Sequence, residues 1–290
     1  MSTTIEWTGF SWNPSTGCDR ISPECDHCYA LTMAKRLKVM GATKYQNDGD
    51  PRTSGPGFGV TMHPDVVLEP VLKWSRTPRM VFVDSMSDVF HARISVSFLG
   101  RIFATMALTP QHTYQVLTKR PNRMHDLLTD GRVQTAMQEA LLDIVRNGPS
   151  LPAWNTKLLF LRAEHCPWPL PNVWLGPSIG VDEYCWRADE LRQTPAAVRF
   201  LSCEPLLGPL PSLDLTDIDW VIIGGESGRG FRPLDLDWVR DIRDRCQAQT
   251  IALFFKQVGG IRPKTGGRFL DGRTWDEYPP TNHPAGTVMA

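Results

Sequence analysis

Short apolar runs that end in small or polar residues recur along this chain of 290 residues. Six of them have the length of a β-strand, and most are almost continuously apolar. Continuous apolar runs are typical of strands in a parallel sheet that is covered on both faces. The pattern therefore predicts six buried parallel strands, at residues 79–83, 113–117, 173–176, 198–202, 220–223 and 251–255.

Helical patterns fall between several of these runs. Residues 96–108 carry apolar side chains at helical spacing, from Phe98 to Met106. Similar patterns cover residues 29–40, 133–145 and 236–246. Alternating strands and helices are typical of βα units. The sequence therefore predicts an α/β fold, namely a full or partial TIM-type (β/α) barrel with parallel strands and loop insertions.

The predicted barrel occupies residues 1–258. Two stretches rich in glycine and proline, near residues 41–70 and 148–172, have the character of insertions. Residues 259–290 follow the last predicted strand, and we expect them to form a C-terminal extension packed on the barrel.

Polar side chains follow the predicted strands directly. In a TIM-type barrel the residues after each strand form the active face. We therefore expect one mouth, the open end of the barrel, to collect these polar side chains, which are Asp84, Ser85, Asp88, Lys119, Glu204, Glu226 and Lys256.

Composition restricts the classes of partner. The formal net charge is zero, with 31 basic and 31 acidic residues, and a strong non-specific grip on nucleic acid needs an excess of Lys and Arg. No apolar segment has the length of a membrane span. The first residues lack the pattern of a secretory signal. These features predict a reduced, cytoplasmic protein with no membrane association.

Three cysteines near the N-terminus form the most specific pattern in the chain. Cys25 and Cys28 are separated by two residues, and Cys18 lies six residues before Cys25 on a loop that contains glycine and proline. Thiolates are soft ligands suited to zinc or to iron–sulfur clusters. A structural zinc ion and an iron–sulfur cluster each usually take four protein ligands. Three ligands leave one position open for chemistry, unless a distant residue completes a structural zinc site.

The cysteine segment resembles the cluster loop of radical S-adenosylmethionine (SAM) enzymes, although that family usually spaces its first two cysteines by three residues. The resemblance implies a 4Fe–4S cluster bound by Cys18, Cys25 and Cys28, with SAM on the fourth iron and an external electron donor as partner. It places His27 and Tyr29 near the adenine of SAM. The expected ligands of the SAM amino group follow the second strand of such barrels, which here are Asp84, Ser85, Ser87 and Asp88.

Most of the chain also resembles an uncharacterised family encoded by phages and prophages, itself regarded as similar to radical SAM enzymes. The resemblance is carried by four segments, at residues 12–30, 201–209, 220–233 and 254–257. The resemblance favours a functional role for the glycine-rich segment Gly224-Gly225-Glu226, which we expect to contact SAM or substrate. It also implies a nucleotide or a nucleic-acid base as substrate.

These features predict a radical SAM enzyme that cleaves SAM to generate a 5′-deoxyadenosyl radical. The candidate catalytic residues are Cys203, Glu204 and Lys256, and the other cofactor-binding candidates are Lys119, Gly224, Gly225 and Glu226. Two alternatives belong to other classes. One is a zinc-stabilised binding or interaction protein of phage origin, and the other is a barrel without catalysis that binds a nucleotide through its glycine segment.

Overall fold

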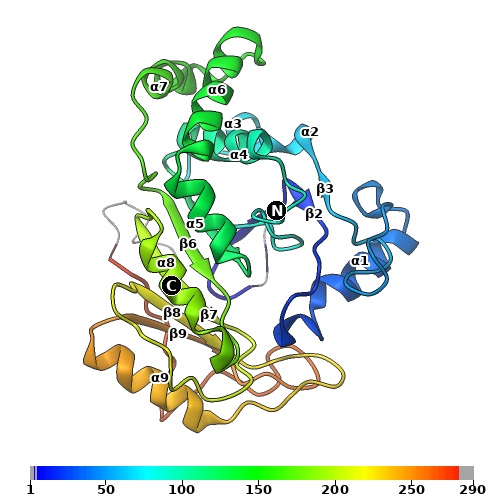
Figure 1. The fold of residues 1–290 in the computed structure, drawn as a ribbon, viewed down its shortest axis with the longest axis vertical. Coiled ribbons are helices and arrows are strands. Elements are labelled where there is room, and N and C mark those ends of the chain that lie inside the picture. The colour runs from blue at the N-terminus through cyan, green and yellow to red at the C-terminus, as the bar shows by residue number, and fades with distance from the viewer. Residues whose placement is uncertain (1–2, 4, 281–290) are drawn as a thin grey trace.

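The computed structural model describes residue 3 and residues 5–280. Its centre is a seven-stranded sheet in the order β1-β4-β5-β6-β7-β8-β9, curled into a half-barrel (Figure 1). All neighbouring strands in it are parallel. The strands are β1 (Phe10–Trp12), β4 (Met80–Val83), β5 (Thr113–Thr118), β6 (Val173–Pro177), β7 (Val198–Cys203), β8 (Trp220–Gly224) and β9 (Ala252–Gln257).

The predicted parallel α/β sheet is confirmed, and each predicted strand lies within two residues of an observed one. The sequence pattern missed β1, because its three residues are too few to form a distinct apolar run. It also ended the last strand too early. β9 continues to Gln257, so Lys256 lies inside the strand instead of after it. The pairing of β9 with β8 is irregular at that point.

Helices follow most strands of the sheet. They are α1 (Tyr29–Val39), α2 (Pro64–Val67), α3 (Glu69–Leu72), α4 (Val96–Leu108), α5 (Pro121–Thr129), α6 (Arg132–Asn147), α7 (Ala153–Glu164), α8 (Trp186–Gln193) and α9 (Leu236–Ala248). Two short strands, β2 (Ser15–Thr16) and β3 (Thr61–Met62), pair antiparallel outside the main sheet. No helix in the described part of the chain combines the length and apolarity that a bilayer crossing requires.

Local signals explain where the helices begin. The hydroxyl of Ser95 accepts a hydrogen bond from the backbone N–H of Phe98 and so caps α4, as expected of serine before a helix. The Asp235 carboxylate caps α9 in the same way, through the N–H of Asp237. α1 begins directly after Cys28 and lies to the right in Figure 1, apart from α4, α5 and α8.

The two faces of the sheet carry different apolar clusters. Alternate strand residues such as Val81 and Leu201 pack with the helices in one large core. The residues between them belong to a second, mainly aromatic cluster without helical members. Because side chains alternate across a strand, this aromatic cluster lies on the face away from the helices. Its buried members are Trp7, Phe82, Trp174, Phe200, Trp220, Ile222 and Phe254.

The predicted insertions and extension contain more regular structure than their composition indicates. All of α7 falls inside residues 148–172. Two hydrogen bonds join the extension to the sheet. The backbone N–H of Phe255 in β9 donates to the carbonyl of Trp275, and the indole of Trp220 in β8 donates to the carbonyl of Glu277. The last part of the extension, residues 281–290, lies outside the described residues.

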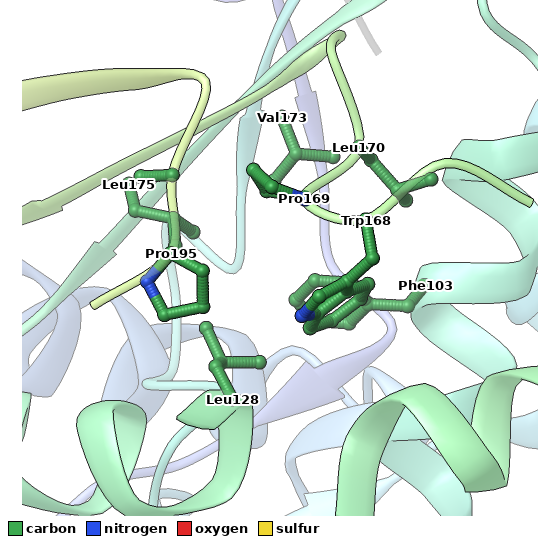
Figure 2. Close-up of a pocket in the computed structure, with 9 residues that line it drawn as sticks. Phe103, Leu128, Trp168, Pro169, Leu170, Val173, Leu175 and Pro195 are labelled. Atoms are coloured by element: carbon green, nitrogen blue, oxygen red, sulfur yellow. The ribbon is translucent and has the colours of Figure 1, made fainter. Parts of the chain in front are cut away.

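A small apolar pocket lies between the helices and the loop that leads into β6 (Figure 2). Phe103 and Leu128 reach it from α4 and α5, and Trp168 and Leu170 reach it from the loop. Val173, at the first position of β6, also lines it. The pocket therefore lies near the amino ends of the strands, away from the predicted mouth, and its lining is apolar throughout.

Candidate functional site

Cys18, Cys25 and Cys28 lie on one loop, residues 17–28, which we call the cysteine loop. It begins beside β4, where the N–H of Gly17 donates to the carbonyl of Met86 at 2.9 Å and the Ser87 hydroxyl donates to the Gly17 carbonyl at 2.7 Å. Gly17 has φ of +89°, and a Cβ there would lie 2.3 Å from the carbonyl oxygen of Gly59. Only glycine fits this position, so the start of the loop is fixed by backbone packing.

The same loop then crosses to the ends of β6 and β8. The N–H of Gly180, just after β6, donates to the Glu24 carboxylate at 2.8 Å. Arg232, beyond β8, donates to the carbonyl of Pro23 at 3.1 Å. His27 Nδ1 lies 2.9 Å from Oε2 of Glu226, which also follows β8. One loop is therefore anchored at the carboxyl ends of three strands.

The three thiols in the loop are free. Arg120 Nη1 donates to the sulfur of Cys18 at 3.3 Å. Burial raises the pKa of Cys18 to about 12, and the nearby Asp88 carboxylate adds to this while Arg120 opposes it. The backbone N–H of Cys28 donates to the carbonyl of Cys25 at 3.2 Å, which closes a tight turn. Cys18 and Cys28 pack against the same small apolar cluster, which includes Met86 and Ala30.

Within the described residues, no three His, Cys, Asp or Glu side chains are grouped so as to hold a metal ion. The chemistry of the donor set nevertheless fits a soft metal. It consists of three free thiols on one anchored loop, with the Arg120 guanidinium beside the sulfur of Cys18. Thiols bind metal as thiolates. Metal binding here therefore requires deprotonation and a common orientation of the three sulfurs.

The acidic segment after β4 lies directly beside the cysteine loop. Asp84 is buried with φ of +55°, and its carboxylate accepts hydrogen bonds from the hydroxyl and the N–H of Ser15. Burial raises the pKa of Asp84 to about 7, although the Ser15 hydrogen bonds oppose the rise. Asp88 accepts from the Thr118 hydroxyl at 2.8 Å and from Arg120 Nη1 at 2.8 Å. Asp84 therefore joins the segment after β4 to β2, and Asp88 joins it to the end of β5.

The serines of this segment are engaged as well. The Ser85 hydroxyl donates to the Asn13 side chain at 3.1 Å, and the Ser85 carbonyl accepts from the Tyr29 hydroxyl. Ser87 donates to Gly17, as described above. The predicted SAM amino-group ligands are thus brought together near the cysteines, but their oxygens already have protein partners.

Glu226 is buried and fully hydrogen-bonded. It accepts from the backbone and the guanidinium of Arg232, and it contacts His27. Burial alone would raise the pKa of Glu226, but the hydrogen bonds from Arg232 and His27 outweigh it and hold the pKa at about 2. Glu226 therefore connects the cysteine loop to β8. Packing explains the glycine at the neighbouring position 225, since a Cβ there would lie 1.9 Å from the carbonyl oxygen of Val258.

Two lysines of the mouth differ in their partners. Lys256 forms an ion pair with Glu204, and both side chains are less than one-fifth exposed. A Cβ on Gly224 would lie 3.3 Å from the side chain of Glu204, so the glycine leaves room for that carboxylate. Lys119 Nζ donates to the Ser178 hydroxyl at 3.1 Å. In the described structure, no carboxylate lies within ion-pair distance of Lys119.

Cys203 does not lie in the mouth. It is the last residue of β7, it is completely buried, and it packs in the core on the helix side of the sheet. The prediction placed Cys203 beside Glu204 because the two are adjacent in sequence. Alternation along β7 puts Cys203 on the same face as Leu201, in the helix-side core. Glu204 lies beyond the end of the strand and reaches Lys256 in the mouth.

Sequence reasoning missed Glu24. Its side chain is completely buried beneath the end of β6 and lies 3.6 Å from Nη1 of Arg187, on α8. A glutamate in a polar loop has no sequence signal that distinguishes it from a solvated one. Only the partners that the fold supplies, which lie more than 150 residues away, reveal its role.

These features define a parallel α/β half-barrel protein with a three-cysteine loop anchored across the carboxyl ends of its strands. The chain belongs to the family described as "Protein of unknown function (DUF5131)", whose model matches residues 2–279. No curated protein matches the chain, and no solved structure matches it.

Proposed function

We propose that this protein is a radical SAM enzyme built on a partial TIM-type barrel. The observation that carries the proposal is the position of the cysteine loop, whose three free thiols are held over the carboxyl ends of β4, β6 and β8. The carboxyl ends of parallel strands are where α/β proteins bind ligands and carry out chemistry. Cys18, Cys25 and Cys28 are the proposed ligands of a 4Fe–4S cluster.

The cluster, when bound, would supply the open iron position for SAM and the electron for its reductive cleavage. The protein contributes position and exclusion of water. Arg120 places a positive charge beside the sulfur of Cys18 and is itself fixed by Asp88. The aromatic cluster buries the face of the sheet that lies away from the helices, so water is excluded from that face.

Lys119 is the proposed binding residue for a carboxylate or phosphate group. The charge of Lys256 is neutralised by Glu204, whereas the direct partner of Lys119 is a neutral hydroxyl. A half-buried cation with no carboxylate within ion-pair distance is suited to an anionic ligand. The carboxylate of SAM or an anionic group of the substrate satisfies this requirement. The Glu204–Lys256 pair remains the proposed contact for polar groups of the substrate.

The proposed partners are SAM, an external electron donor and a substrate that contains a nucleobase. The neutral net charge favours a nucleotide over a long nucleic acid, because polymer binding relies on many phosphate contacts. Stimulation of SAM cleavage by nucleotides or by nucleic acid, tested separately, distinguishes these two substrates. We place the reaction in the cytoplasm, where thiols stay reduced.

Metal analysis and a single-turnover assay test the proposal. Anaerobically reconstituted protein should bind about four iron ions with sulfide, and it should release 5′-deoxyadenosine from SAM when a strong reductant is added. A Cys25→Ala variant should lose both properties. A Cys166→Ala variant should keep them, because Cys166 lies outside the cysteine loop. One zinc ion per chain without sulfide would overturn the proposal and favour the zinc-stabilised binding protein.

A further inference from the structure

A buried ion pair lies directly beneath the cysteine loop. The side chains of Glu24 and Arg187 are 0% and 1% exposed, and Oε1 of Glu24 lies 3.6 Å from Nη1 of Arg187. Glu24 belongs to the loop, immediately before Cys25, whereas Arg187 belongs to α8. The pair thus connects a loop near the N-terminus to a helix on the outside of the half-barrel.

The surroundings of the pair are closely fitted. The N–H of Gly180 donates to the same Glu24 oxygen at 2.8 Å. A Cβ on Gly180 would lie 2.5 Å from Cγ of Glu24, so the glutamate occupies the space that any other residue at position 180 would need. Arg187 donates to the Ser178 carbonyl at 2.8 Å and stacks on the Tyr184 ring at 4.1 Å. Both charged groups are therefore held from several directions.

Stability does not explain why such a pair is present. The desolvation of two charges offsets most of their attraction, and apolar residues of similar size often give equal or greater stability. The polar atoms are also incompletely satisfied. Nε of Arg187 has no hydrogen-bond partner among the described residues. Buried pairs of this kind can specify one arrangement of the chain over others.

We propose that Glu24 and Arg187 form a buried latch that positions the cysteine loop and holds Cys25 over the end of β6. Cys25 follows Glu24 in a single-turn helix, Pro23–Cys25, so a shift of the Glu24 carboxylate moves the Cys25 sulfur with it. Glu24 and Arg187 are positioning residues. The purpose of the positioning, metal binding by the three thiols, rests on the proposed function, whereas the latch itself is a property of the metal-free chain.

Alkylation of the metal-free protein tests the latch without any cofactor. Iodoacetamide labelling, followed by mass spectrometry of each cysteine peptide, measures how often Cys25 becomes accessible. Cys25 should react at least about tenfold faster in a Glu24→Gln variant and in an Arg187→Met variant, because local opening becomes easier. The control Asp189→Asn alters an exposed charge on the same helix and should leave the rate unchanged. Equal Cys25 rates in wild type and in both latch variants would overturn the proposal.

A double variant separates positioning from stability. Glu24→Leu combined with Arg187→Met removes both charges, so the melting temperature should return toward that of the wild type. Cys25 should nevertheless stay at least about tenfold more reactive, because the ion pair and the hydrogen bond that the Gly180 N–H donates to Glu24 are both missing. Wild-type protection of Cys25 in the double variant would overturn the latch. Faster labelling of the core residue Cys246 together with Cys25 would indicate global unfolding and would also overturn it.

Iron content after reconstitution distinguishes failure of the latch from failure of the proposed function. If the wild type binds iron and sulfide, the latch variants should bind less than half as much. If the wild type binds none, the proposed function fails, while the alkylation result still decides whether the latch exists. If all variants bind iron as the wild type does, the latch has no role in cluster binding and its assigned purpose is overturned, while the alkylation result still decides whether the latch exists.

Discussion

The imidazole of His27 lies 2.9 Å from the carboxylate of Glu226, although 199 residues separate them in sequence. His27 lies between two cysteines of the loop, and Glu226 follows β8. The sequence assigned both residues separately to the binding of SAM. Their contact indicates a different role for Glu226, because its oxygens are used to hold the cysteine loop on the sheet.

A Glu226→Gln variant should be less stable at neutral pH by about 2–3 kcal/mol, because charged hydrogen bonds to Arg232 are lost. The pKa of Glu226 is lowered to about 2. A lowered pKa contributes stability above the unfolded pKa near 4, and this contribution is lost as the pH falls toward 2. Urea denaturation should therefore show a difference between variant and wild type that shrinks between pH 4 and 2.

The matched control for Glu226 is Glu139→Gln, which alters an exposed glutamate on α6. We expect it to change the free energy of unfolding by less than about 0.5 kcal/mol. A difference for Glu226→Gln that stays constant from pH 7 to pH 2 would contradict the assigned role of its charge.

An Asp84→Asn variant should show the opposite pH dependence. The pKa of Asp84 is raised to about 7, so the folded state favours the protonated acid. Its contribution to stability is present below pH 4 and is lost as the pH rises through 7. Asparagine carries no charge and tolerates the left-handed backbone at φ of +55°. Relative to wild type, the variant should therefore gain about 2–4 kcal/mol between pH 4 and pH 8.

Urea denaturation at both pH values measures this gain. The control is Asp143→Asn, which alters an exposed acid on α6. It should give the same small difference at both pH values. A difference for Asp84→Asn that does not change with pH would show that Asp84 is not the buried acid described above.

A Lys119→Met variant should weaken SAM binding by about 10- to 100-fold, which corresponds to the loss of one charged hydrogen bond. Equilibrium dialysis of reconstituted, unreduced protein measures the dissociation constant. Lys157→Met is the control, since Lys157 is exposed on α7. If SAM affinity is unchanged but affinity for the substrate falls, Lys119 binds an anionic group of the substrate. If neither affinity changes, Lys119 is not an anion-binding residue.

Alanine substitution of Gly225 tests the packing of the segment after β8. Gly225→Ala would place a methyl group 1.9 Å from the carbonyl oxygen of Val258. We expect it to cost about 2–4 kcal/mol, since backbone on both sides must move. Gly208→Ala is the control, because its added methyl group meets no atom within 4 Å. Thermal unfolding of both variants decides the point, and equal melting temperatures would refute the packing account.

The sequence alone determined the regular elements and much of the site's inventory. Helix α4 spans Val96–Leu108, as its apolar spacing predicts. The acids and lysines at the strand ends do gather at one edge of a parallel sheet with the cysteine loop. Such features depend on patterns within a few neighbouring residues and on the common direction of parallel strands, both of which are readable from sequence.

The tertiary structure decided which of these side chains are available. It placed Cys203 in the helix-side core, paired Lys256 with Glu204, and gave Glu24 its partner Arg187. These outcomes depend on strand register and on the path of the cysteine loop across the sheet. Both result from long-range packing, in which a shift of one residue reverses the face that a side chain occupies. No local pattern records that choice.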